Sequence, residues 1–217
     1  MSIEHDGSGA TARPTPAGDA AAPVPLWNIA NILTMLRLVM VPVFVVLAVM
    51  YAGSVPGRLL ITGVFVAAMI TDFLDGRLAR KYGLITDFGK IVDSIADKAI
   101  TGAAFIMLSV WEYIPWWMTV LILARELGIT LMRMGILKYG ALPANWAGKL
   151  KTAFQSVAIT FCLLPFELLW GPARWIGWTL VLIAVILTVW SGLVNVQDGL
   201  RMRREALAAR GTDAPRA

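Results

Sequence analysis

Six long apolar stretches limit what this chain can fold into more than any other feature of its sequence. They cover residues 29–51, 58–80, 90–111, 116–139, 149–170 and 175–199. A helix rises about 1.5 Å per residue, so each stretch can cross a hydrocarbon core of about 30 Å. The short breaks between them carry Gly and Pro, and nothing has the pattern of a strand. The sequence predicts an all-α integral membrane bundle of six transmembrane helices.

The composition agrees with this and narrows the chemistry. The 217 residues are 58% hydrophobic and 15% charged, whereas soluble domains are about a quarter charged. The net charge of +5 is expected to meet anionic lipid headgroups rather than nucleic acid. His5 and Cys162 are the only residues of their types, which excludes disulfide frameworks and His-based triads or zinc sites in the membrane part. Any catalytic base is therefore Asp, Glu, Lys or Tyr.

The ends of the chain differ from its middle. Residues 1–24 and 205–217 are polar or rich in small residues, and such segments bury too little apolar surface to order themselves. We expect disordered tails there, flanking a six-helix domain at 25–204. Positive charge is concentrated on one predicted side of the bundle, which should be cytoplasmic by the positive-inside rule. Both termini would then lie on the cytoplasmic side of the cell membrane. The residues of that side are Arg77, Arg80, Lys81, Lys90, Lys138, Lys149, Lys151, Arg201, Arg203 and Arg204, against Arg58 and Arg174 opposite.

Four aspartates gather at the predicted inner ends of the second and third stretches. Asp72 and Asp75 are three residues apart, and Asp93 and Asp97 are four apart, so each pair shares one helix face. Counted from the outer ends of two antiparallel neighbours, Asp72 should lie level with Asp97, and Asp75 with Asp93. The four carboxylates are therefore expected to converge near the cytoplasmic surface.

Such a cluster is costly at membrane depth unless something offsets its charge. A divalent cation does so, and oxygen-only ligands suit Mg²⁺ or Mn²⁺ rather than zinc. We therefore predict a metal site at Asp72, Asp75, Asp93 and Asp97. The alternative is a charged collar in which these carboxylates pair with nearby basic side chains: Arg77, Arg80, Lys81 and Lys90.

The same residues carry a family resemblance. Asp72, Asp75, Gly76, Ala79, Arg80, Gly89, Asp93 and Asp97 reproduce the pattern Asp-x-x-Asp-Gly-x-x-Ala-Arg, eight residues, Gly-x-x-x-Asp-x-x-x-Asp. The chain thereby resembles the CDP-alcohol phosphatidyltransferase family over about residues 27–200. That resemblance implies a six-helix membrane enzyme, usually a homodimer, with its active site open to the cytoplasm.

The resemblance also implies roles for individual residues. Asp72, Asp75 and Asp93 would bind metal, and Asp97 would act as the base close to it. The nucleotide would lie against Asp72, Gly76 and Ala79, with Arg80 beside its phosphates. The first stretch adds Asn31 and Thr34 to the predicted nucleotide site, although interhelical hydrogen bonding is their alternative role. Arg37 lies in the inner half of that stretch and, being costly there, should face protein or substrate.

Within the family, the chain is most similar to the subgroup that uses glycerol 3-phosphate as acceptor. Asn28-x-x-Asn31-x-x-Thr34-x-x-Arg37, Arg125-Glu126 and Lys149-x-Lys151-Thr152-x-x-Gln155 carry this similarity. It implies transfer of the phosphatidyl group from CDP-diacylglycerol to glycerol 3-phosphate, with release of CMP. A dianionic acceptor needs basic residues beside the metal. The predicted phosphate-binding residues are Arg125, Arg133, Lys149 and Lys151, with internal ion pairing or headgroup contact as their alternatives.

Two other functions remain open at this point. Another acceptor within the family is one of them: an inositol phosphate, or phosphatidylglycerol, which would give cardiolipin. A divalent-cation transporter is the other, with the aspartates as its ion site. A transport path would need acidic residues in the outer halves of the helices, where Glu112 and Glu167 lie only near the ends. The enzyme is therefore the favoured reading.

Overall fold

The computed structural model describes residues 29–82, 87–136 and 146–212, all of which lie in helices or in the turns between them. The long helices are α1 (Ile29–Tyr51), α2 (Val55–Tyr82), α3 (Asp87–Val110), α4 (Trp116–Ile136), α5 (Trp146–Leu163) and α7 (Ala173–Thr212), and α6 (Phe166–Leu169) is a single turn. The predicted all-α membrane bundle is confirmed, and no strand occurs within the described ranges.

Four of the long helices are apolar enough over their length to cross a membrane without help. These segments are Asn31–Tyr51, Val55–Arg77, Gly148–Leu169 and Ala173–Met202. Charged residues occur within the other two long helices as well, three in α4 and five in α3. Charged side chains at membrane depth are tolerated where they face the interior of a bundle. The charged residues of the long helices are therefore expected to face the interior of the bundle or its ends.

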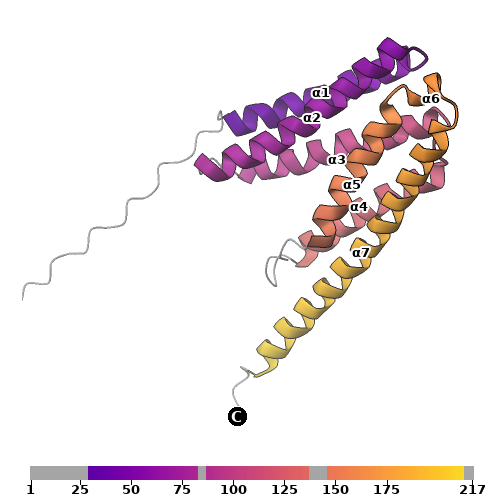
Figure 1. The fold of residues 1–217 in the computed structure, drawn as a ribbon. Helices are drawn as coiled ribbons and strands as arrows, with labels where there is room; N and C mark the ends of the chain where they lie inside the picture. Colours follow the sequence, from indigo (N-terminus) through magenta and orange to yellow (C-terminus); the bar gives the residue numbers. More distant parts are fainter. Residues whose placement is uncertain (1–28, 83–86, 137–145, 213–217) are drawn as a thin grey trace, which may run out of the picture.

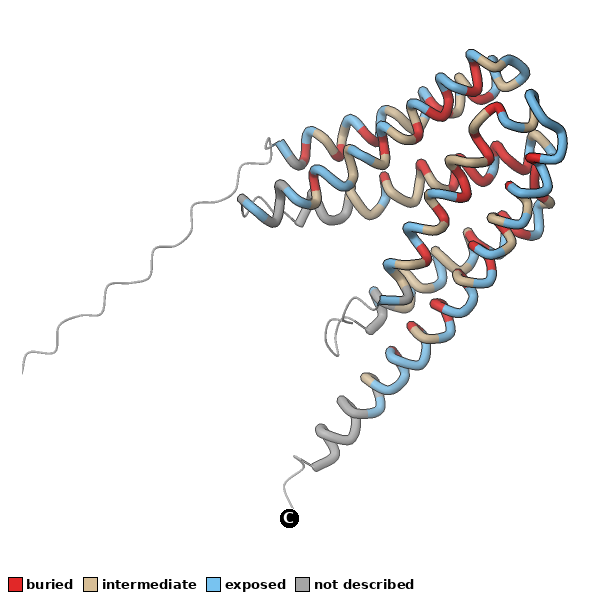
Figure 2. Tube along the Cα trace, in the orientation of Figure 1, coloured by how far each residue is buried: buried red, intermediate tan, exposed pale blue. Residues whose placement is uncertain are grey.

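The helices form two groups that meet at one end. Figure 1 shows α1, α2 and α3 running side by side, and α4, α5 and α7 forming a second group that diverges from the first away from α6. Residue contacts agree, since α1 packs on α2 and α3, while α7 packs on α5 and α4. Buried residues are densest where the groups meet (Figure 2), and α7 is mostly exposed over residues 196–201.

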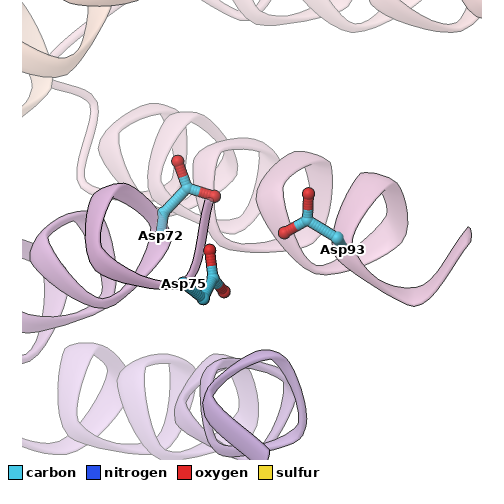
Figure 3. Close-up of side chains that lie close together, drawn as sticks. All are labelled: Asp72, Asp75 and Asp93. Atoms are coloured by element: carbon cyan, nitrogen blue, oxygen red, sulfur yellow. The ribbon is translucent and has the colours of Figure 1, made fainter. Parts of the chain in front are cut away.

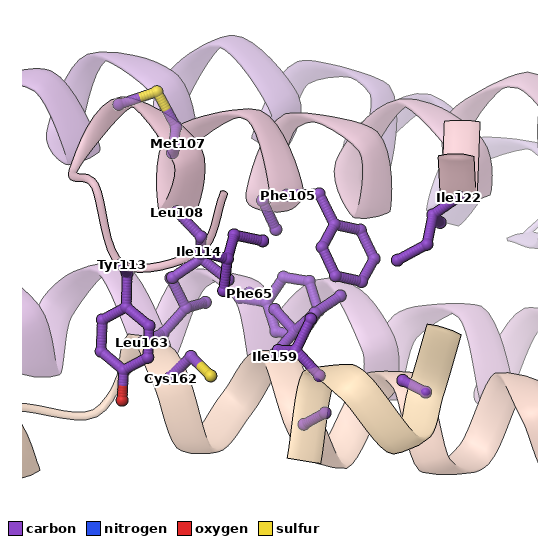
Figure 4. Close-up of a cluster of buried hydrophobic side chains, with 14 of the residues drawn as sticks. Phe65, Phe105, Met107, Leu108, Tyr113, Ile114, Ile122, Ile159, Cys162 and Leu163 are labelled. Carbon is purple, nitrogen blue, oxygen red and sulfur yellow. The ribbon is translucent and has the colours of Figure 1, made fainter. Parts of the chain in front are cut away.

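Aromatic and branched side chains fill the region where the two groups meet. Phe65 of α2, Phe105 of α3, Ile122 of α4 and Ile159 of α5 are all fully buried and belong to one cluster (Figure 4). Tyr113 lies in the same cluster, in the turn between α3 and α4. The preceding residue, Glu112, has a φ of 56°, which is uncommon for a residue with a side chain. This left-handed residue lets the chain reverse within a short turn.

A buried ion pair ties the closed end together. Arg58 of α2 donates to Glu167 of α6 at 2.5 Å and to the backbone carbonyls of Ala52 and Cys162. Its guanidinium also lies 3.9 Å from the centre of the Trp111 ring. One side chain thus joins α2 to α5, to α6 and to the turns that follow α1 and α3. This end stays closed while the other end diverges.

Two boundaries differ from the sequence-based expectation. The fifth apolar stretch, expected to be one helix over 149–170, ends as α5 at Leu163 and resumes as α6, because Pro165 lacks the N–H that a continuous helix needs. The last apolar stretch was expected over 175–199 and the C-terminal tail from residue 205, yet α7 continues to Thr212. Glu205-Ala206-Leu207-Ala208-Ala209 is rich in strong helix formers, and these favour continuation of the helix.

Candidate functional site

Three of the four predicted aspartates converge on one arginine. Arg37 of α1 is fully buried, and its Nη1 lies 2.8 Å from Oδ1 of Asp72 and 2.8 Å from Oδ1 of Asp93. Its Nη2 lies 2.5 Å from Oδ2 of Asp75. This arrangement follows from the packing of α1 against both α2 and α3. Arg37 therefore supplies the positive charge that three clustered carboxylates need.

The geometry of the three carboxylates fits a divalent cation. One oxygen from each of Asp72, Asp75 and Asp93 lies within 4.8 Å of the others, and Figure 3 shows the carboxyl groups from α2 and α3 facing the same space. Oxygens bound to Mg²⁺ at about 2.0–2.1 Å are separated by at most about 4.2 Å, so small side-chain movements would bring these oxygens to a bound ion. Each carboxylate contacts Arg37 through one oxygen and has a second oxygen besides. The set can hold a metal ion.

The cluster is open on one side. The side chain of Asp75 is 5% exposed, whereas those of Asp72 and Asp93 are 39% and 47% exposed. Thr34 of α1 lies on the closed side and donates to Oδ2 of Asp75 at 3.3 Å. Asp75 is thus held by Arg37 and Thr34, while the other two carboxylates face outwards. A cation and an anionic ligand can reach the cluster from the open side.

The predicted nucleotide site is only partly described. Thr34 joins the aspartate cluster, Asn31 is buried one turn before it on α1, and Gly76 is half-buried directly after Asp75. The Thr34 bond is the interhelical contact that was the alternative to a nucleotide role. The side chains of Ala79 and Arg80 lie outside the described residues. Their predicted roles stay predictions.

Asp97 is not a member of the three-carboxylate group. It lines a partly open cavity of about 160 Å³ between α3, α4 and α5, together with Lys98, Glu126 and Lys151. Asp97 is nevertheless one turn after Asp93 on the same face of α3, so the cavity adjoins the aspartate cluster. This position suits a base that faces a small ligand in the cavity better than it suits a fourth metal ligand.

The basic residues predicted to bind phosphate lie in different places. Lys151 is buried, lines the cavity and forms an ion pair with Glu126. Lys149 is exposed, because residues two apart on a helix point to nearly opposite sides. Only Lys151 of this pair faces the cavity.

Arg125 of α4 points towards α7 instead. Its Nη2 donates to the hydroxyl of Ser191 at 2.5 Å, and its Nη1 lies 3.2 Å from Glu126. A Cβ added at Gly192 would lie 3.2 Å from Nε of Arg125, so the arginine packs closely on that helix. The side chain of Arg133 lies outside the described residues. The internal ion pair considered for Arg125 is therefore present, and its phosphate-binding role stays a prediction.

Sequence reasoning did not assign two residues that organise this region. It expected Arg37 to face protein or substrate, yet assigned the charge-compensating role to residues near the aspartates in sequence. It treated Glu126 only as a neighbour of Arg125, whereas Glu126 also pairs with Lys151 across the cavity. The cost of burying an ion alone was a signal that each needed a partner, but it does not say which helix supplies that partner.

Comparison with known proteins agrees with this geometry. The chain matches the CDP-alcohol phosphatidyltransferase family over residues 27–190. It is 47% identical over 186 residues to a Mycobacterium tuberculosis protein named probable phosphatidylglycerophosphate synthase, covering 85% of this chain and 87% of that one. It is 35% identical to a Bacillus subtilis CDP-diacylglycerol–glycerol-3-phosphate 3-phosphatidyltransferase, with 77% and 92% covered. A 33% identical Escherichia coli protein has the same name and coverage. The chain belongs to the CDP-alcohol phosphatidyltransferase family.

Proposed function

We propose that this protein transfers the phosphatidyl group from CDP-diacylglycerol to glycerol 3-phosphate, forming phosphatidylglycerophosphate and releasing CMP. The observation that carries the proposal is the placement of Asp72, Asp75 and Asp93 beside a cavity that contains Asp97 and Lys151. The three aspartates suit a metal-bound diphosphate, and the cavity suits a small anionic alcohol. The names of the relatives support the same pair of substrates.

Asp72, Asp75 and Asp93 would hold Mg²⁺ or Mn²⁺, which when bound supplies positive charge for the diphosphate and for the departing CMP. Arg37 fixes one oxygen of each carboxylate and so orients the remaining oxygens. Thr34 does the same for Asp75. Positioning and electrostatics dominate phosphoryl transfer, and these side chains provide both.

Asp97 is the proposed base. Its carboxylate takes the proton of the acceptor's 1-hydroxyl, and the hydroxyl oxygen then bonds to the phosphorus that carries diacylglycerol. The bond from that phosphorus to the CMP oxygen breaks, and CMP leaves with the electron pair. Lys151 faces the same cavity and would attract the acceptor phosphate. That phosphate would replace Glu126 as the ion-pair partner of Lys151. The reaction needs no histidine or cysteine.

The test uses purified full-length protein with CDP-diacylglycerol and Mg²⁺, offered glycerol 3-phosphate, inositol phosphate or phosphatidylglycerol in separate reactions. We expect CMP release and a product of phosphatidylglycerophosphate mass only with the first acceptor. Product with a different acceptor would correct the substrate but keep the family chemistry. No CMP with any of the three would refute the proposal.

Asp97 and the exposed Asp198 of α7 provide a matched pair of variants. Asp97→Asn is expected to abolish CMP release while the protein still binds CDP-diacylglycerol. Asp198→Asn, the same chemical change far along α7, should keep wild-type turnover. Normal turnover in Asp97→Asn would refute its assignment as the base.

The cellular setting is also part of the proposal. We place the protein in the cell membrane with both termini and the site on the cytoplasmic side, since the basic residues lie mostly at that end. We also propose a homodimer, on family resemblance. Labelling of single cysteines introduced at each helix end of a Cys162→Ser variant, in intact and opened cells, tests the orientation. Labelling of the aspartate end in intact cells would reverse it.

A further inference from the structure

The cavity beside the aspartates contains one buried polar atom that the described protein does not satisfy. Oε1 of Gln155 has no hydrogen-bond partner, although the residue is only 3% exposed and lines the cavity. Leaving a buried acceptor unpaired is expensive, and most such atoms have a partner in folded proteins. Gln155 also belongs to the sequence pattern that begins at Lys149 on α5, and the proposed function gives Gln155 no role.

The hydroxyl groups around Gln155 are already engaged. Thr101 donates to the backbone carbonyl of Asp97 at 2.9 Å, Thr152 to that of Gly148 at 3.0 Å, and Ser156 to that of Thr152 at 3.0 Å. Each hydroxyl has a single proton to donate. Neither these hydroxyls nor the cavity lysines bond Oε1 of Gln155 in the described structure, so a molecule that enters the cavity can supply the donor.

The residues that line the cavity indicate where that donor would lie. Gln155 is four residues after Lys151 on α5, so it shares the same face one turn further along. Fully buried Phe105 and Ile122 also line the cavity. A volume of about 160 Å³ admits on the order of ten water-sized groups, which is the size of a three-carbon polyol phosphate. A ligand whose phosphate lies at Lys151 would place its carbon chain near Gln155.

We propose that Gln155 is a specificity-determining residue that accepts a hydrogen bond from the hydroxyl of the acceptor that does not react. This inference rests on the proposed function. One hydroxyl of glycerol 3-phosphate gives its proton to Asp97, and the 2-hydroxyl remains as the donor that Oε1 of Gln155 lacks. A phosphate or a carboxylate cannot fill this place, because neither donates. The site therefore selects a vicinal diol over a simple alcohol.

The experiment compares glycerol 3-phosphate with 3-hydroxypropyl phosphate, which lacks only the 2-hydroxyl. Wild-type protein should show a kcat/KM for CMP release about tenfold higher with glycerol 3-phosphate. Gln155→Met keeps the side-chain length but removes the acceptor, and it should lose that tenfold with glycerol 3-phosphate and nothing with the deoxy compound. Both acceptors are measured on one preparation, so their ratio does not depend on the folded fraction.

Gln155→Glu retains an oxygen acceptor and should retain the preference, even if its charge weakens binding of both phosphates. Loss of the preference in this variant would overturn the assignment of Oε1. An equal fall with both acceptors in Gln155→Met would overturn the inference in favour of a structural or water-binding role, as would equal wild-type rates. No CMP release from wild-type protein with either compound would overturn the proposed function and the inference with it.

Discussion

Replacing Arg37 by methionine should destabilise the protein strongly when divalent cations are removed. The guanidinium is fully buried and lies within 2.5–2.8 Å of three carboxylates. Methionine keeps most of the buried volume and removes the charge. Breaking a buried ion pair by removing one partner costs about 3–5 kcal/mol, because the other charge is left without compensation. Here three carboxylates share that loss, so the upper part of this range is expected.

Thermal unfolding of the detergent-purified protein measures the effect. A loss of about 3–5 kcal/mol lowers Tm by roughly 6–20 °C for a chain of this size, and EDTA should be present so that no metal replaces the missing charge. Adding Mn²⁺ should then restore more of the Tm to Arg37→Met than it adds to wild-type protein. Without Arg37, no positive charge offsets the repulsion among the three carboxylates. A bound metal ion therefore relieves more repulsion in the variant than in wild-type protein.

Arg204→Met is the matched control, since Arg204 is exposed on the far part of α7 and its loss should move Tm by only about 1–2 °C. Asp75→Asn combined with Arg37→Met provides a second check. If the two residues act on each other as the 2.5 Å contact indicates, the double variant should be less destabilised than the sum of the single ones. Unchanged Tm of Arg37→Met in EDTA, or strict additivity in the double variant, would refute the reasoning.

Three further predictions follow from other parts of the fold. Asp97→Asn should reduce the rate of CMP release to background while equilibrium binding of CDP-diacylglycerol stays within about twofold; a rate near wild type would contradict its role. Glu167→Gln should cost about 3–5 kcal/mol, seen as a lower Tm, because it leaves the buried charge of Arg58 unpaired, and a wild-type Tm would show that this pair does not hold the closed end. Glu112→Gly should raise Tm by a few degrees, since glycine adopts the left-handed conformation at about 1 kcal/mol less cost, and an unchanged or lower Tm would contradict it.

The features that depend on neighbouring residues of one helix were predictable. The spacing of Asp72 and Asp75 places both on one face of α2, and the short link to α3 brings Asp93 opposite them. The apolar stretches of the sequence were enough to locate the six long helices. The same kind of reasoning applies to Lys149 and Lys151, whose separation by two residues already implies that only one can face the cavity.

The features that depend on which helices touch were not predictable from one sequence. Arg37 is 35 residues before Asp72 and 56 before Asp93, and nothing in local spacing shows that α1 packs between the helices that carry them. The pairing of Glu126 with Lys151 has the same origin. The same holds for Arg125, whose long side chain reaches the hydroxyl of Ser191 on α7, a contact that no spacing in the sequence indicates.

The length of α7 has a practical consequence. Its 40 residues extend about 60 Å at 1.5 Å per residue, twice the thickness of a typical hydrocarbon core. Roughly half of this rod must therefore stand in water or among headgroups. A fluorophore or affinity label attached at its last turn would be carried well clear of the lipid tails, where it could report on the enzyme without interfering with the aspartates.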